Sequence, residues 1–109
     1  FNMVNIIVTS TETVPGMKVV QILGIVKGNT VRTRNIGRDI GAGFKNLIGG
    51  EIKSYTEMIS QARDEAYNRM VNQAIDLGAD GVINVRFMTS AVLAGASELL
   101  AYGTAVKLK

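Results

Sequence analysis

A chain of 109 residues with a formal net charge of +3 has the size of one domain built around one hydrophobic core. Apolar residues make up 47% of it and charged residues 19%, which excludes the composition of a disordered segment. The absence of cysteine and histidine excludes disulfides and every metal site that needs thiolate or imidazole ligands.

Charge and apolar runs also limit the expected partners and location. A net charge of +3 with three Tyr, three Phe and no Trp is a weak basis for nucleic-acid binding. No apolar run reaches the length of a membrane span or of a signal-peptide core, so we expect a cytoplasmic protein without a membrane partner. We expect the single domain at residues 3–109, with Phe1 and Asn2 preceding a natural start at Met3.

The first part of the chain predicts strands. Residues 5–9 predict a short edge strand, and Pro15-Gly16 interrupts the chain after it. The next segment, residues 17–27, is rich in β-branched residues and predicts a longer strand that ends at the turn pair Gly28-Asn29.

Positive charge and glycine coincide over residues 27–53, which hold six basic and two acidic residues, a local charge of +4. Asp39 is placed to cap a short helix over residues 40–48. Backbone amides at that helix start, beside the arginines, could hold an anion. A solvated rim, a subunit contact and plain packing of the glycines are the alternatives. The candidate residues for this anion or interface site are Arg32, Arg34, Arg38, Asp39, Gly43, Gly49 and Gly50.

A long amphipathic helix is predicted over residues 51–77, where apolar residues recur at helical spacing and Gly78 follows as the residue that ends it. Two further strands are predicted at residues 82–88 and 99–106. The order is therefore β-α-β-β, which indicates an α+β fold with a three-stranded sheet packed on one long helix.

The alternation along the last predicted strand separates two faces. One face carries Leu99, Ala101, Gly103 and Ala105, and its mostly small side chains favour close approach of the helix. The opposite face carries larger side chains, and a single helix cannot cover both. We therefore expect self-association through this second face. Its candidate residues are Leu100, Tyr102 and Val106, joined by either Val85 and Phe87 or Val82 and Met88.

No catalytic arrangement is recognisable. Without His or Cys, a nucleophile would need Ser or Thr beside Lys, or a carboxylate pair. Asp64 and Glu65 are adjacent and point about 100° apart on a helix. Asp76 and Asp80 do not fit a calcium loop, because Phe87 stands at the twelfth position. We expect no enzyme activity, no cofactor and no metal.

Three stretches resemble the bacterial YbjQ family: NIGRDIGAGFKNLIGGEI (35–52), LGADGVINVRF (77–87) and AYGTAV (101–106). The resemblance implies a dodecin-subunit-like fold, in which a three-stranded antiparallel sheet wraps on a long helix, and a ring of five subunits. It points to the matched positions Arg38, Asp39, Gly43, Gly49 and Gly50 as the best site candidates.

The YbjQ family is also described as heavy-metal-binding, whereas the ligands that zinc and copper prefer do not occur in this chain. Its carboxylates and methionines could build only a hard-cation site or a weak Cu(I) site. We therefore expect a ring-forming homo-oligomer that acts as a non-catalytic binding or scaffolding module with a small-anion site. A heavy-metal-binding protein is the first alternative, and an enzyme of unknown reaction is the second.

Overall fold

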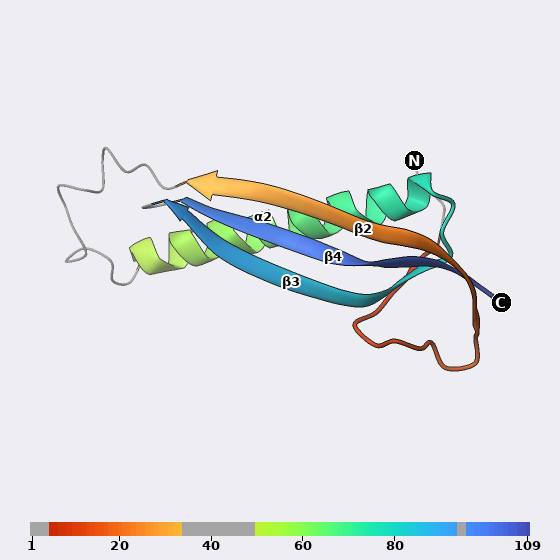
Figure 1. The fold of residues 1–109 in the computed structure, drawn as a ribbon. Coiled ribbons are helices and arrows are strands. Elements are labelled where there is room, and N and C mark those ends of the chain that lie inside the picture. The colour runs from red at the N-terminus through yellow and green to blue at the C-terminus, as the bar shows by residue number, and fades with distance from the viewer. Residues whose placement is uncertain (1–4, 34–49, 94–95) are drawn as a thin grey trace.

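The computed structural model describes residues 5–33, 50–93 and 96–109. These residues form one long helix and a four-stranded sheet with the strand order β1-β3-β4-β2. Figure 1 shows β4 between β2 and β3, with α2 running along them. The elements are β1 (Ile7–Val8), β2 (Val19–Thr33), α2 (Gly50–Asp76), β3 (Gly81–Leu93) and β4 (Ala96–Leu108). No helix within the described ranges is both long and apolar enough to cross a membrane.

The sheet has four strands where three were predicted, and it is mixed where it was expected to be antiparallel. β2 and β3 both pair antiparallel with β4, whereas β1 pairs parallel with β3, with Ile7 opposite Gly81. The segment predicted as a short edge strand is therefore the fourth strand. The α+β class and the single long helix are confirmed.

β2 continues through the Gly28-Asn29 pair, which was predicted to be a turn, and reaches Thr33. The reason is contact with α2. A Cβ atom on Gly28 would lie 2.5 Å from the backbone nitrogen of Met70 and 2.6 Å from Cβ of Arg69. The glycine is needed here because the strand passes directly beneath the helix backbone.

α2 ends at Asp76, and Gly78 closes it as predicted, with a left-handed φ of 77°. The amide of Ala79 donates to the carbonyl of Ala74 (3.0 Å), and the amide of Gly78 donates to the carbonyl of Ile75 (2.9 Å). This pair of bonds is a Schellman motif, which satisfies the last carbonyls of the helix. Leu77, the last residue of the predicted helix, lies one residue beyond the end of α2 and is 48% exposed.

The core lies between α2 and one face of the sheet, which we call the helix face. Its helical side is a fully buried stripe with a spacing of four residues: Ala62, Ala66, Met70 and Ala74. Leu99, Ala101 and Ala105 of β4 are buried against it, as the alternation predicted. Three of the four helical residues are alanines, so the helix can sit close to the strands.

The opposite face of the sheet, which we call the open face, follows from the strand register. A bulge in β3 between Ile83 and Arg86 contains Asn84, whose φ is 55°. The bulge turns Val85 and Phe87 toward the helix face and places Arg86 and Met88 on the open face. Of the two alternative sets predicted for this face, only Met88 lies on it, because sequence alternation alone cannot reveal the extra residue of a bulge.

Candidate functional site

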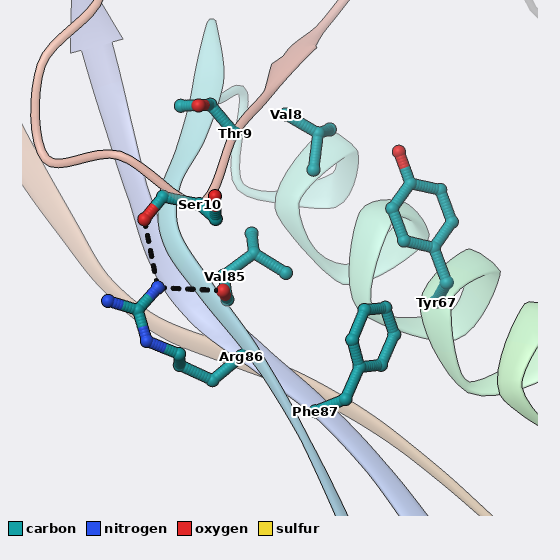
Figure 2. Close-up of a pocket in the computed structure, with 7 residues that line it drawn as sticks. All are labelled: Val8, Thr9, Ser10, Tyr67, Val85, Arg86 and Phe87. Carbon is teal, nitrogen blue, oxygen red and sulfur yellow. Dashed lines mark hydrogen bonds between the residues drawn. The ribbon is translucent and has the colours of Figure 1, made fainter.

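A hollow of about 390 Å³ lies between α2, the end of β1 and β3 (Figure 2). Its walls are apolar and are formed by Val8, Tyr67, Val85 and Phe87. It exists because α2 packs on β2 and β4 and scarcely reaches β3, which leaves Phe87 47% exposed. The hollow suits an apolar group and holds no base beside a nucleophile among its lining residues.

Arg86 borders this hollow and is fixed in place by the backbone. Its Nη1 atom donates to the carbonyl oxygen of Ser10 at 2.8 Å and to that of Val85 at 2.9 Å (Figure 2). Arg86 lies opposite Tyr102 in the β3–β4 register, and Lys27 lies opposite Tyr102 in the β2–β4 register. The open face therefore has a row in which Tyr102 stands between two cationic residues.

The open face carries most of the exposed apolar side chains of the sheet. Ile25 is 76% exposed, Ile22 is 69% exposed and Met88 is 51% exposed. Of the three residues predicted for the oligomer face, Leu100 and Tyr102 are half-buried on this face, in register with Met88 and Arg86. Val106 is fully buried within one chain, so it contributes no exposed surface to a contact.

Arg32, the first residue of the predicted anion site, has a partner within the chain. Its guanidinium donates to Glu65 at 2.5 Å, and Glu65 also accepts a hydrogen bond from Arg69. The hydrogen bond from Arg32 and the positive charges of both arginines lower the pKa of Glu65. This ion pair joins β2 to α2 and offsets the positive charge of Arg32.

All but one of the other residues of that predicted site fall outside the part of the chain that the structure describes. Arg34, Arg38, Asp39, Gly43 and Gly49 lie outside the described residues, as does the predicted short helix over 40–48. Gly50 is the first residue of α2.

Side chains of α2 also cover the outer edge of β2. The side-chain oxygen of Gln73 accepts a hydrogen bond from the amide of Lys27 at 2.9 Å. Nη1 of Arg69 donates to the carbonyl oxygen of Asn29 at 2.6 Å. Both backbone groups face away from β4, so the helix occupies strand-pairing groups that an edge strand would otherwise expose.

Asp80 has the turn position expected of it, between α2 and β3. Its carboxylate accepts a hydrogen bond from the backbone amide of Leu108 at 2.9 Å and another from Lys107 at 3.3 Å. The bond from Leu108 is the main cause that lowers the pKa of Asp80, and Lys107 adds to it. Asp80 therefore fixes the start of β3 to the end of β4.

The available donor atoms do not fit a thiophilic or imidazole-bound metal. The chain has no His and no Cys, and in the described ranges no three acidic residues gather around a common point. Glu65 and Asp80 are already held by arginine, lysine or backbone donors. Met70 is fully buried in the core.

Sequence reasoning missed both the hollow and the Lys27–Tyr102–Arg86 row. Each depends on the bulge in β3, which sets which residues face α2. The available signal was Asn84, a residue of low β propensity that adopts left-handed backbone more readily than its apolar neighbours.

Comparison with known proteins supports the fold and identifies relatives. The fold resembles the crystal structure of a protein of unknown function from Pediococcus pentosaceus, described as belonging to the DUF74 family, with a TM-score of 0.64. The two sequences are 18% identical over 95% of this chain and 98% of the other, so this likeness shows the fold alone.

Sequence relatives are much more similar. The UPF0145 protein of Methanoculleus marisnigri is 65% identical and aligns over 94% of this chain and 95% of its own length. The corresponding proteins of Archaeoglobus fulgidus and Thermotoga maritima are 62% and 56% identical, over 95% and 94% of this chain and 96% and 97% of theirs. Residues 6–109 match the family model YbjQ, described as "Putative heavy-metal-binding". The resemblance seen in the three sequence stretches is thereby confirmed, and the chain belongs to the YbjQ (UPF0145) family.

Proposed function

We propose that this protein is a cytoplasmic, ring-forming homo-oligomer of five subunits that acts as a non-catalytic binding or scaffolding module. The observation that carries the proposal is the open face, where Ile22, Ile25 and Met88 are each more than half exposed. The description of the family model and the names of the relatives mention no enzymatic reaction, which is consistent with a role without catalysis.

The size of the open face supports a subunit contact. Three strands of 13 to 15 residues form a surface of roughly 43 by 14 Å, or about 600 Å², at the usual strand spacing and rise. That area approaches the ~800 Å² per partner of a standard protein interface.

The shape of the subunit supports the same proposal. Its radius of gyration is 17.5 Å and its extents are 56 × 28 × 21 Å, whereas a compact domain of this length would have a radius of gyration of about 13 Å. An elongated subunit with one helix and an uncovered sheet face buries less of its own surface than a compact one.

A ring needs a head-to-tail contact between unlike surfaces. The two edges of the sheet differ in the required way. The β2 edge is partly occupied by Gln73 and Arg69, whereas β3 is paired with β1 only near its start. Such unlike edges favour a heterologous contact over a symmetric edge-to-edge dimer.

The test is light scattering coupled to size-exclusion chromatography on the unmodified protein. Five copies of an 11.7 kDa chain give an expected mass of about 58 kDa at micromolar concentration. A well-folded monomer of 11.7 kDa under these conditions would refute the proposed assembly.

Heavy-metal binding is the competing function that the family description suggests. No imidazole or thiolate ligand exists in the chain, so we expect less than one equivalent of zinc or copper per subunit after dialysis. Elemental analysis of the purified protein measures this directly, and one tightly bound equivalent would favour the metal function instead.

A further inference from the structure

We propose that the hollow between α2, β1 and β3 binds a small uncharged aromatic molecule of one or two rings, held between Tyr67 and Phe87. The inference rests on the binding role proposed above, since it names a ligand class for that role. It does not rest on the ring of subunits, because α2, the end of β1 and β3 of one chain form the hollow.

The hollow lies on the helix face, so a ligand in it leaves the open face free for a neighbouring subunit. Phe87 and Met88 show this separation, because they are adjacent in β3 and lie on opposite faces. The β3 edge at the hollow is also occupied by the chain itself. The amide of Thr9 donates to the carbonyl of Val82 at 2.9 Å, and the amide of Val85 donates to the carbonyl of Thr9 at 3.0 Å. A neighbouring strand therefore cannot pair with β3 at this point.

Three of the side chains around the hollow are fixed by packing within the chain. Val85 is only 8% exposed and belongs to the buried core. Val8 and Tyr67 are half-buried and pack against the same core. Phe87 completes the apolar lining and is 47% exposed although it lies on the helix face. A hollow that is already formed needs little ordering of its walls when a ligand enters, which favours affinity.

The volume and lining of the hollow indicate the size and class of its ligand. An apolar cavity of about 150 Å³ is large enough to bind benzene. This hollow measures about 390 Å³, so it has room for a second ring. Figure 2 shows Tyr67 reaching from α2 and Phe87 from β3 toward the same space. Aromatic side chains favour offset or edge-to-face contact with another ring, which adds to the gain from burying apolar surface.

The charges at the hollow favour a neutral ligand. Among its described lining residues, Arg86 is the only charged one. Its Nη1 atom donates to the carbonyls of Ser10 and Val85. Figure 2 shows the guanidinium beside these carbonyls and away from the rings of Tyr67 and Phe87. An anionic group between the rings would lose its water without gaining a cation. A hydroxyl group on the ligand can instead form a hydrogen bond with the hydroxyl of Tyr67.

The experiment is a titration with 2-naphthol, followed by calorimetry and by NMR shifts of the backbone amides of α2, β1 and β3. We expect saturable binding with a dissociation constant below about 1 mM. Decahydro-2-naphthol has the same hydroxyl group and a similar apolar area but no aromatic ring, so it should bind about fivefold more weakly. Phe87→Ala should weaken the binding of 2-naphthol about tenfold.

Met88→Ala is the matched control for Phe87→Ala. Met88 is the next residue of β3 and is 51% exposed, close to the 47% of Phe87, but it lies on the opposite face of the sheet. We expect this variant to leave the affinity for 2-naphthol unchanged. Tyr67→Phe keeps the aromatic ring and removes only the hydroxyl, so it should weaken the binding about threefold. Circular dichroism separates loss of binding from loss of fold.

Each other outcome overturns the proposal. If 2-naphthol produces no saturable shifts, or if Met88→Ala weakens it as much as Phe87→Ala, the hollow is not its site. Equal affinity for 2-naphthol and decahydro-2-naphthol would mean that the site has no preference for an aromatic ligand. If 2-naphthol binds a dissociated subunit but not the assembled protein, a neighbouring subunit fills the hollow instead. Light scattering on the same samples keeps the two proposals apart. A monomer that binds 2-naphthol refutes the ring of subunits and leaves this site standing, whereas an assembled protein that does not bind it refutes this site alone.

Discussion

The two faces of the sheet are formed by alternate residues of the same strands, yet they differ in how completely one chain buries them. On the helix face, Ala101 and Ala105 are fully buried beneath alanines of α2. On the open face, Ile25 remains 76% exposed. Small residues allow close helix contact and complete the core, whereas larger residues opposite, such as Ile25 and Met88, remain more than half exposed in the single chain. Folding therefore uses one face and leaves the other available for binding.

Substitution of Val106 should cause the largest loss of stability. This residue belongs to the open-face alternation and is nevertheless fully buried within the chain. Val106→Asp would bury an unpaired charge, so we expect a loss of more than about 4 kcal/mol in unfolding free energy, or no folded protein. Urea denaturation followed by circular dichroism measures it. A folded variant with altered assembly only would mean that Val106 faces another subunit.

Gly28 tests how tightly the helix face is closed. In Gly28→Ala the new methyl group would meet the backbone of Ala66 and Met70, which cannot move without shifting α2. We expect a loss of about 3 kcal/mol in unfolding free energy, at the upper end for overpacked cores. The same denaturation measurement applies. Lys27→Ala, one position away on the open face, is the control and should cost less than about 1 kcal/mol.

Ile25 tests the open face directly. Ile25→Asp places a charge on a side chain that is exposed in the single subunit, so we expect each subunit to remain folded. In an assembled ring that buries this residue, the same charge should dissociate the subunits. Light scattering on the variant and the unmodified protein compares the two states. An unchanged mass for both would remove Ile25 from the contact.

Acid should produce the smallest of these effects. The folded pKa of Asp80 is lowered, chiefly by the amide of Leu108, so its contribution is complete above the ordinary value of 3.8 and is lost as the pH falls through the folded pKa. Denaturation midpoints between about pH 2 and pH 6 should therefore fall at the acid end. Asp80→Asn should flatten this fall, and adding Glu65→Gln should flatten it further, since the pKa of Glu65 is also lowered. An equally steep fall in the double variant would contradict the assignment.

Features set by nearby residues could be predicted from the sequence. The end of α2 at Gly78 and the small-residue face of β4 both follow from short local patterns, and both are confirmed. The features that were missed depend on contacts between distant parts of the chain. Gly28 lies inside β2 because α2 crosses it, and Arg32 forms an ion pair with Glu65 from the helix. Neither relation has a local sequence signal.

The candidate site was missed for the same kind of reason. The row of Lys27, Tyr102 and Arg86 exists only in one strand register, and the bulge at Asn84 determines that register. Without the extra residue of the bulge, the register that starts with Ile83 opposite Thr104 would place Val85, not Arg86, opposite Tyr102. An asparagine in a strand was the only hint that the alternation would shift.

The side chains that α2 places along the edge of β2 have a consequence for solubility. A newly made subunit exposes strand residues such as Ile22 and Ile25 before it meets its partners. Fibre growth would need the amide of Lys27 and the carbonyl of Asn29 for continuous strand pairing, and Gln73 and Arg69 already occupy both. The helix thus interrupts the template in the middle of the strand, so an unassembled subunit can remain dispersed during the time that it waits for a partner.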